Sequence, residues 1–479
     1  MRLWTSTPRA DFAKEIYDVA GIFYPQVDIV PGPDEAELCV IHQETVEGTR
    51  RRSLLSLSGL VSAELRYEDA VLSDAVRDKR LCKRKLKVAL YRLLKEHSGI
   101  QPPWGALTGI RPTRLVYEGM SGGLSLEEAL VEVGEYYDLT AGKTDLLGRI
   151  VSAQQTLTQP GENDVDIYIG IPFCESRCRY CSFISAQVGS GALLEPYVKA
   201  LASEIAAVIR LVREKGLQPR AFYMGGGTPT ALSADQLDRV LTAASPLIAA
   251  CREATVEAGR PDSVTQERLL VLQKHGIGRI SVNPQTIHDQ TLELIGRRHS
   301  HLQTQRAFEL ARSLGFDHIN MDLIGGLPGE TPQMFSQTLD WVKKCAPESL
   351  TVHTLCVKRS SDMHRWQDSL PSGAAVEKMV DMGLEAALEM GMRPYYLYRQ
   401  KHMAGNLENV GYALPGRECL YNVDTMEDTL SVLAMGAGGI SKLVTQNRDL
   451  VRRAPNVKEI SQYIDRVDEM SRRKAELWE

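Results

Sequence analysis

The feature that most constrains the fold is an alternation of short apolar runs and helical patterns between residues 165 and 355. The apolar runs have the length and composition of buried strands. They are Asp166–Ile171, Ala221–Met224, Ala254–Ala258, Arg279–Val282, His318–Leu323 and Ser349–Leu355. The helical patterns are Leu193–Glu214, Ala234–Leu247, Val264–His275, Thr304–Leu314 and Pro332–Lys344. Strand–helix units of this length predict an α/β fold with a parallel sheet whose outer face is covered by helices.

The alternation leaves two forms of parallel sheet open. An open doubly wound sheet and a barrel both satisfy the order of strands and helices. In both forms, ligands bind beyond the carboxyl ends of the strands. Functional residues are therefore expected in the loops that directly follow the strands.

Three cysteines lie within eight residues at the end of the first predicted strand. Cys174, Cys178 and Cys181 have the spacing C-x3-C-x2-C. One loop with this spacing can bind three irons of a [4Fe-4S] cubane and leave the fourth iron open to a small molecule, whereas clusters that only carry electrons normally use four cysteines. A zinc site without its fourth ligand, or three buried thiols, is the alternative. The nearest downstream histidine is His275, which gives a compact zinc site little support.

A glycine-rich segment, Gly225–Thr230, follows the second predicted strand. Glycines let a ligand approach the main chain closely and leave N–H groups free to bind a carboxylate or an amine. A triple glycine alone indicates only a turn. Because this one ends the strand that follows the cysteine loop, it predicts a ligand site shared by the two loops.

Composition and charge exclude several other classes of protein. Of the 479 residues, 43% are hydrophobic, which is enough for large cores without disulfides or structural metals. A net charge of −5 gives no reason to expect nucleic acid as a partner. The N-terminal residues do not resemble a secretory signal, and no run approaches the ~20 apolar residues of a membrane span. The remaining cysteines are scattered, as in a reducing compartment, so we expect a cytoplasmic protein.

Three domains are predicted, with boundaries at residues 160 and 370. The first is a small α+β domain that contains a basic helix over Arg77–Leu94, and the second contains the strand–helix units. The third contains a helix over Ala374–Met390, a tyrosine-rich strand over Pro394–Tyr398 and a charged helix over Val457–Lys474. The predicted domains are residues 1–160, 161–370 and 371–479.

Together, the cysteine loop, the glycine-rich segment and Asn320–Thr331 resemble the oxygen-independent coproporphyrinogen III oxidase family of radical S-adenosylmethionine (SAM) proteins. The resemblance covers residues 165–445. The peptide Trp104–Pro112, with Tyr396–Lys401 and Gly405–Tyr412, is similar to the HemZ-type coproporphyrinogen dehydrogenase branch. This resemblance implies a partial (β/α)6 barrel, with an N-terminal α+β domain and a C-terminal extension.

The resemblance also implies an activity in haem biosynthesis. In this family, a reduced cluster cleaves SAM, and a 5′-deoxyadenosyl radical removes hydrogen from a propionate of coproporphyrinogen III. Loss of CO2 and one electron leaves a vinyl group, and two rounds give protoporphyrinogen IX. The implied partners are a cytosolic electron donor and an electron acceptor, and no catalytic side chain is implied beyond the cluster and SAM.

Matching positions imply the residues that contact these cofactors. Tyr168 packs beside cluster-bound SAM, Tyr180 faces the adenine, and Glu257 binds the ribose hydroxyls or the amino group. The methionine end of SAM is contacted by Gly226, Gly227 and Thr228. A second SAM, found in one member of the family, is contacted at the positions of Gln285, Arg297, Asp322 and Cys356.

Two departures from the family pattern bear on the function. The oxidase branch has a further cysteine two residues after the third ligand, where this chain has Phe183. The haem-chaperone branch has a histidine where this chain has Gly405, so this chain would lack the axial haem ligand. Three functions stay open: the decarboxylating dehydrogenase, a haem chaperone, and a radical SAM enzyme with another substrate.

The other histidines and the basic helix are interpreted as structural or solvated. His299, His301 and His353 show no metal-binding spacing. The basic helix is a solvated face or, alternatively, attracts a polycarboxylate or an acidic electron donor. Its basic residues are Arg77, Lys79, Arg80, Lys83, Arg84, Lys85 and Lys87.

Overall fold

The computed structural model describes residues 1–24, 26–109, 111–157, 159–181, 186–357, 369–400, 403–445 and 451–479. These residues form two compact units. Unit 1 comprises residues 1–148 and 399–407, and unit 2 comprises residues 149–398 and 408–479. The predicted division into three domains at residues 160 and 370 stays a prediction.

Unit 1 is a five-stranded mixed sheet with helices. Its strands lie in the order β2-β1-β3-β4-β5, and the last three form an antiparallel meander. The predicted α+β character of this region is confirmed. The elements are β1 (Arg2–Ser6), α1 (Ala13–Phe23), β2 (Asp28–Ile29), β3 (Leu38–Glu47), β4 (Arg50–Gly59), β5 (Ala63–Ala70), α2 (Ala75–Ser98), α3 (Thr113–Ser121), α4 (Leu126–Tyr137) and the start of α5 (Ala141–Leu157).

The basic residues of α2 are largely paired within unit 1. Lys79 and Lys83 lie 2.9 Å and 3.2 Å from Asp11, and Lys83 and Lys87 lie 3.0 Å and 3.4 Å from Glu15. Pairs that are exposed to solvent, such as Lys79 with Asp11, contribute about 0–1 kcal/mol each, whereas the pairs with Glu15 are partly buried. They favour an ion-paired helix face over an attraction for a polycarboxylate.

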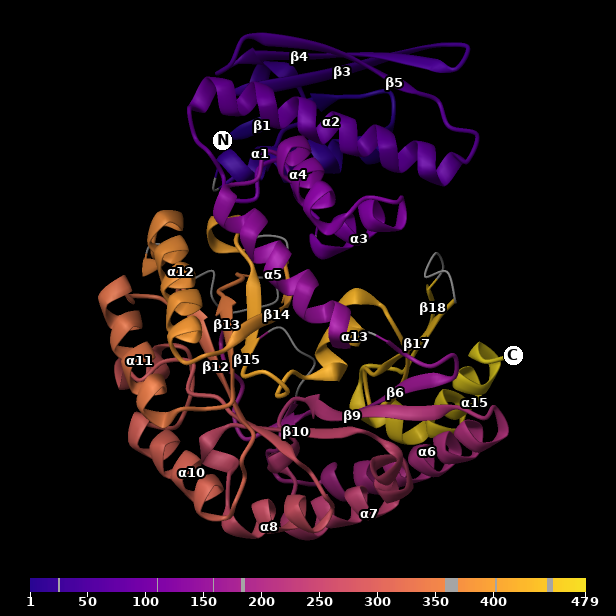
Figure 1. The fold of residues 1–479 in the computed structure, drawn as a ribbon, viewed down its shortest axis with the longest axis vertical. Coiled ribbons are helices and arrows are strands. Elements are labelled where there is room, and N and C mark those ends of the chain that lie inside the picture. The colour runs from indigo at the N-terminus through magenta and orange to yellow at the C-terminus, as the bar shows by residue number, and fades with distance from the viewer. Residues whose placement is uncertain are drawn as a thin grey trace. The chain divides into compact units, whose positions relative to one another are not determined.

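Unit 2 is built on an eleven-stranded sheet in the order β14-β15-β13-β12-β11-β10-β9-β6-β16-β17-β18. Its six central strands are parallel, and Figure 1 shows helices along the outer side of the curved sheet. The central strands are β6 (Asp164–Ile171), β9 (Gln218–Gly226), β10 (Glu253–Gly259), β11 (Arg279–Val282), β12 (Ile319–Gly325) and β13 (Ser349–Thr354). The helices beside them are α6 (Leu194–Glu214), α7 (Ala234–Ala250), α8 (Gln266–Lys274), α9 (Asp289–Leu294), α10 (His301–Ser313), α11 (Pro332–Cys345) and α12 (Gly373–Glu389). This is the predicted (β/α)6 arrangement.

The C-terminal extension lengthens the sheet at both edges. β15 pairs antiparallel with β13, and β16 pairs parallel with β6. The single helix predicted over Val457–Lys474 is wrong, because α14 and α15 are separate helices that meet at Arg466. The added elements are β14 (Arg393–Tyr398), β15 (Asn409–Ala413), α13 (Leu420–Glu427), β16 (Ser431–Met435), β17 (Ile440–Val444), β18 (Val451–Pro455), α14 (Ile460–Asp465) and α15 (Val467–Leu477).

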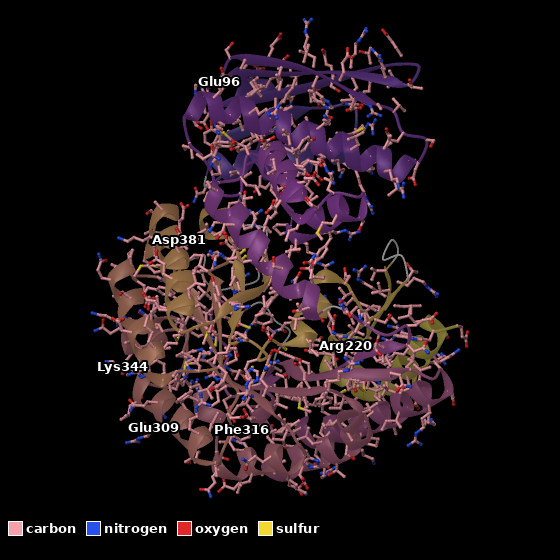
Figure 2. All side chains as sticks on the ribbon, in the orientation of Figure 1. Glu96, Arg220, Glu309, Phe316, Lys344 and Asp381 are labelled. Carbon is pink, nitrogen blue, oxygen red and sulfur yellow. The ribbon has the colours of Figure 1, made fainter. Side chains whose placement is uncertain are left out.

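The two faces of the central sheet differ in character. Along β12, Met321 and Leu323 are fully buried, while Asn320 and Asp322 are partly exposed. Since successive strand residues point to opposite faces, the polar pair lies on the face away from the helices. The helices carry exposed charged side chains such as Glu309, Lys344 and Asp381 (Figure 2). Among the described residues, no helix combines the length and the apolar character needed to cross a bilayer.

Candidate functional site

The clustered cysteines lie on the loop that follows β6. Cys178 is buried, whereas Cys174 and Cys181 are partly exposed. The N–H of Cys181 donates to the Cys178 carbonyl at 3.1 Å, and the N–H of Val188 donates to the Cys174 carbonyl at 3.0 Å. These main-chain hydrogen bonds fold the loop back on itself at the carboxyl ends of the parallel strands, and all three thiols are on this loop.

Arg179 fastens this loop to the end of α9. Its N–H donates to the Ile295 carbonyl at 2.9 Å, and its Nη1 donates to the Leu294 carbonyl at 3.0 Å. Gly296 has a φ of 78°, and a Cβ there would lie 3.2 Å from the Arg179 Cγ. A left-handed glycine therefore lets the two segments lie against each other.

The donor set fits an iron–sulfur cluster better than a single metal ion. Within the described ranges, no three His, Cys, Asp or Glu side chains gather as the ligands of one ion would. A structural zinc site needs four ligands that converge on one point. In a cubane, by contrast, each cysteine binds a different iron, so three thiolates on one loop suffice for three irons. The zinc alternative therefore loses support.

The glycine-rich segment contacts the cysteine loop directly. The Gly227 N–H donates to the Ile171 carbonyl at 2.8 Å, and the Thr228 N–H donates to the Phe173 carbonyl at 2.7 Å. A Cβ on Gly227 would lie 2.6 Å from the Phe173 oxygen. The expectation that these N–H groups are left free for a ligand is wrong for Gly227 and Thr228. The pairing of β6 with β9 continues past the strand ends and uses them.

Thr228 also contacts a predicted cluster ligand. Its Oγ1 lies 3.5 Å from the Sγ of Cys174 and can donate to it. Thr228 is 2% exposed, so this contact is shielded from solvent. The glycine-rich segment therefore positions one cysteine through both its main chain and a side chain.

Glu257, on β10, faces a group of tyrosines on the inner side of the sheet. The Tyr223 hydroxyl donates to Glu257 Oε1 at 2.5 Å. Tyr421 stacks on Tyr223 with a centroid distance of 4.5 Å, and Tyr168 lies 5.9 Å from Tyr421 with nearly parallel rings. Burial raises the pKa of Glu257 to about 7. A carboxyl group near the aromatic stack is thus poised to be charged or neutral around neutral pH.

Asp322, on β12, forms a second polar group with two amides and a histidine. Asn283 Nδ2 and Asn320 Nδ2 donate to its carboxylate at 2.7 Å and 2.8 Å. Burial alone would raise the pKa of Asp322, but interactions with His353, Asn320 and Thr351 outweigh it, so the pKa of Asp322 lies below its usual value. His353 Nε2 lies 3.8 Å from Asp322 Oδ2, and His353 Nδ1 lies 3.5 Å from the Tyr398 hydroxyl. His353, expected to be structural or at the surface, therefore lies within the site.

Gln285 and Arg297 are joined to Asp322 by the segment that follows β11. The Gln285 N–H donates to the Asp322 carbonyl at 2.9 Å. Arg297 Nη1 donates to the Asn283 carbonyl at 2.8 Å, while the Asn283 amide donates to the Asp322 carboxylate. Gln285 has a φ of 64°, an uncommon conformation for a residue other than glycine, and its Oε1 is buried without a partner. Such a buried acceptor is suited to receive a donor from a ligand.

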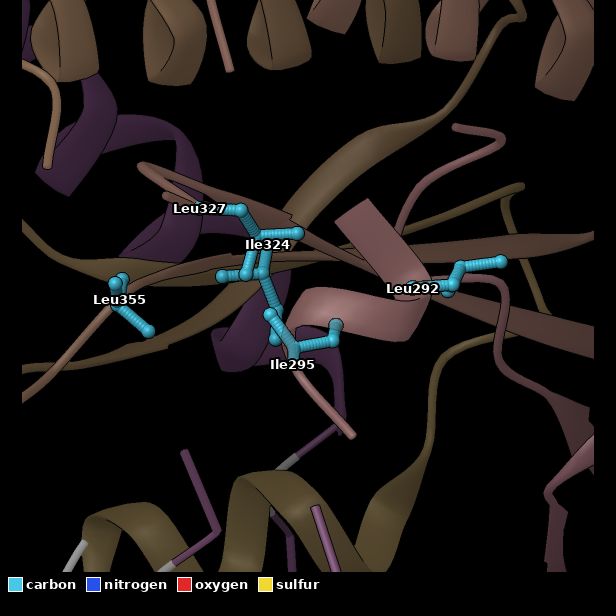
Figure 3. Close-up of a cluster of buried hydrophobic side chains, with 5 residues drawn as sticks. All are labelled: Leu292, Ile295, Ile324, Leu327 and Leu355. Carbon is cyan, nitrogen blue, oxygen red and sulfur yellow. The ribbon is translucent and has the colours of Figure 1, made fainter. Parts of the chain in front are cut away.

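Tyr180 packs on an apolar cluster at the ends of the later strands. The cluster consists of Leu292, Ile295, Ile324, Leu327 and Leu355 (Figure 3). Cys356 follows Leu355 directly, just beyond the carboxyl end of β13. The structure therefore places every predicted site residue at or near the carboxyl ends of the parallel strands. Phe183 lies outside the described residues.

Several residues of the site were not predicted. They are Tyr223, Asn283, Tyr398 and Tyr421. Asn283 directly follows the strand Arg279–Val282, so the expectation that ligands bind beyond the carboxyl ends of the strands could have identified it, whereas Gln285 came from the family resemblance. Tyr421 lies on α13, outside the strand–helix alternation, and no pattern in the sequence links it to Tyr223.

Comparisons with known proteins agree with this geometry. The family model described as the Radical SAM superfamily matches residues 168–342. A solved structure, the radical SAM enzyme coproporphyrinogen III oxidase (HemN) from Escherichia coli, shares the fold with a TM-score of 0.53 and 24% identity. The match covers 67% of this chain and 72% of that chain. Radical SAM proteins use a [4Fe-4S] cluster and SAM, the cofactors that this donor set fits.

Two curated relatives differ in how far the match extends. A heme chaperone HemW from Bacillus subtilis is 37% identical over 198 residues, which cover 40% of this chain and 50% of that relative. An oxygen-independent coproporphyrinogen-III oxidase-like protein, HemZ from Bacillus subtilis, is 35% identical over 467 residues. That match covers 95% of this chain and 93% of the relative. The chain therefore belongs to the radical SAM superfamily and, within it, to the family of HemZ-type oxygen-independent coproporphyrinogen-III oxidase-like proteins.

Proposed function

We propose that this protein converts coproporphyrinogen III to protoporphyrinogen IX without oxygen, by oxidative decarboxylation of two propionate side chains. The observation that carries the proposal is the match to the HemZ-type relative over 95% of this chain. At this coverage it extends into both unit 1 and the C-terminal extension, whereas a match to a heme chaperone covers 40% of this chain. When bound, the cluster and SAM supply a 5′-deoxyadenosyl radical that takes a hydrogen atom from the substrate.

On this proposal, one set of residues holds the cluster and a second set binds SAM. Cys174, Cys178 and Cys181 hold the cluster, and Thr228 and the glycine-rich segment support their loop. Glu257 accepts hydrogen bonds from the ribose hydroxyls or the amino group of SAM. Tyr168, Tyr180, Gln285, Arg297, Asp322 and Cys356 surround SAM or a second SAM molecule.

His353 and Tyr398 are the groups that suit the substrate. Coproporphyrinogen III is a polycarboxylate, and Glu257 and Asp322 would repel it. A histidine N–H and a tyrosine hydroxyl can instead donate to a propionate. Both side chains are partly exposed on the inner face. They would hold the carboxylate that leaves as CO2, and the remaining electron passes to an external acceptor.

The deciding experiment is an anaerobic assay of cluster-loaded protein with coproporphyrinogen III, SAM, a low-potential reductant and an electron acceptor. Formation of protoporphyrinogen IX with two 5′-deoxyadenosines per product supports the proposal. A Cys178→Ala variant is the control and should form neither product. An intact cluster and SAM cleavage without a vinyl product would refute the proposed substrate.

The alternative function is that of a haem chaperone. HemW relatives support it through matches that cover part of the chain. The position of the chaperone histidine is occupied by Gly405, which has a φ of 63°. This left-handed conformation favours glycine over histidine. Stable haem binding by the purified protein, without protoporphyrinogen formation, would select the chaperone.

A further inference from the structure

Arg260 is a buried arginine that contacts the cysteine loop. It directly follows β10, at the same carboxyl edge of the sheet as the cysteines, and is 4% exposed. Its Nη1 donates to the Ser176 carbonyl at 3.1 Å and lies 3.4 Å from the Sγ of Cys178. Its Nη2 donates to the Ser176 hydroxyl at 2.8 Å. No sequence pattern singled out this residue.

All five N–H groups of this guanidinium have an acceptor. Besides the three contacts to the loop, Asp262 accepts from Nε at 3.0 Å and from Nη2 at 2.7 Å. A lysine has its three donors on one nitrogen atom and cannot serve Asp262, Ser176 and Cys178 from the same place.

Arg260 acts on the most deeply buried of the three thiols. Cys178 is 9% exposed, so a donor there is little screened by water. Arg297 is a second buried guanidinium that interacts electrostatically with Cys178. By comparison, the donor to Cys174 is the neutral hydroxyl of Thr228. Cys178 therefore has a charged hydrogen-bond donor where Cys174 has a neutral one.

We propose that Arg260 sets the reduction potential of the cluster through its N–H···S bond to Cys178. Hydrogen bonds to the sulfurs and nearby charge are among the factors that fix the potential of an iron–sulfur cluster. Reduction adds one negative charge to the cluster, and the guanidinium stabilises this reduced state. Asp262 partly offsets the effect, because its carboxylate neutralises the same cation. The inference rests on Cys178 as a cluster ligand and does not depend on the substrate.

The test is an anaerobic redox titration of the full-length, cluster-loaded protein without substrate, followed by EPR. Arg260→Lys should keep its iron but shift the ratio of reduced to oxidised cluster at a fixed potential about tenfold towards the oxidised form. This corresponds to a potential about 59 mV lower for one electron. Arg279→Lys is the matched control, because Arg279 is similarly buried but lies at the start of β11. It is therefore at the amino ends of the parallel strands, away from the cysteine loop. The Arg279→Lys variant should leave the potential unchanged.

A second substitution tests the sign of the effect. Asp262→Asn keeps the N–H···S bond but removes the neutralising carboxylate, so it should shift the potential upwards. An Arg260→Lys protein with full iron and an unchanged potential would overturn the proposal. If the Arg260→Lys protein loses its iron, the Asp262→Asn protein provides the test. A cluster potential above that of the unmodified protein supports the proposal, and an equal or lower potential refutes it. A missing vinyl product would leave these potentials unaffected and count only against the proposed substrate.

Discussion

The hydroxyl of Tyr223 and the carboxylate of Glu257 share a hydrogen bond of 2.5 Å between the neighbouring strands β9 and β10. Gly225 makes room for this arrangement, because a Cβ there would lie 2.8 Å from Glu257 Oε2. The absence of a side chain at Gly225 is thus needed to make room for the Glu257 carboxylate. Glu257 is held at the inner face, where burial keeps its pKa at about 7.

We expect the affinity for SAM to depend on the charge of Glu257. Burial raises its pKa, so the group is neutral below about 7 and a carboxylate acceptor above it. At one pH unit below the pKa only about a tenth is ionised, so SAM should bind up to about tenfold more weakly at pH 6 than at pH 8. Anaerobic calorimetry of cluster-loaded protein measures this. Glu257→Gln should remove the dependence, and Glu267→Gln, at an exposed site on α8, should retain it. An unchanged pH profile in Glu257→Gln would contradict the assigned role.

Replacing any one of Cys174, Cys178 and Cys181 with alanine should abolish the brown colour and reduce iron to less than about one atom per chain, because three thiolates are the minimum that holds the cluster. Iron analysis and absorbance after anaerobic reconstitution measure the loss. Cys345→Ala is the control, since burial raises the pKa of that thiol to about 11 and it lies on α11. Full iron in Cys178→Ala would show that the ligands are assigned wrongly.

The strand–helix pattern predicted the parallel sheet well because its central strands are short, apolar and separated by amphipathic helices. The choice of a partial barrel over an open sheet came from the family resemblance. All six predicted strands overlap observed ones, and the cysteine and glycine-rich loops were placed at the correct strand ends. The break at Arg466 was missed, because apolar residues (Ile460, Tyr463, Val467 and Met470) continue at helical spacing across it, and no glycine or proline marks where the helices meet.

The parts that could not be predicted depend on contacts between distant residues. Arg260 and Cys178 are 82 positions apart, and Asn283 and Asp322 are 39 positions apart. Such pairs form because the register between neighbouring strands brings their carboxyl ends together, and local sequence patterns do not reveal that register. The same register uses the N–H groups of Gly227 and Thr228, which the sequence left open for a ligand.

Gly227→Ala should destabilise the contact between the glycine-rich segment and the cysteine loop. The new Cβ would lie 2.6 Å from the main-chain oxygen of Phe173, so one of the two loops must move. Overpacking of this kind costs about 1–3 kcal/mol, which urea unfolding measures, and SAM affinity should fall with it. Gly278→Ala meets open space and should change neither. Equal stability of the two variants would show that the contact is not tight.

His353→Phe should weaken substrate binding without changing SAM cleavage. The variant removes a donor beside Asp322 and Tyr398 while keeping an aromatic ring. A lost hydrogen bond to a carboxylate costs about 1.5–3 kcal/mol, so the KM for coproporphyrinogen III should rise at least about tenfold. Formation of 5′-deoxyadenosine without substrate is the internal control. Tyr398→Phe should give a smaller change in the same direction, and an unchanged KM in both variants would remove these residues from the substrate site.

Lys474 on α15 should be needed to keep the C-terminal helix on unit 2. Its Nζ lies 2.5 Å from Glu204 Oε1, and both side chains are almost completely buried, with exposed fractions of 1% and 0%. Glu204 also accepts from the Gly436 N–H and the Tyr463 hydroxyl, at 2.8 Å and 2.6 Å, so the pair supports the loop after β16.

Lys474→Met leaves a buried, uncompensated carboxylate and should lower the free energy of unfolding in urea by about 3–5 kcal/mol. Adding Glu204→Gln to this variant removes the charge and keeps an acceptor for the Gly436 N–H and the Tyr463 hydroxyl, so it should recover part of the loss. The recovery is incomplete because Asn456 Nδ2, which donates to Glu204 Oε1 at 2.8 Å, loses its acceptor. Arg472→Met, at a side chain that is 69% exposed on the same helix, should cost less than about 0.5 kcal/mol. If Lys474→Met were as mild as Arg472→Met, water would have to reach Glu204, and the buried pair would not be what holds α15 against α6.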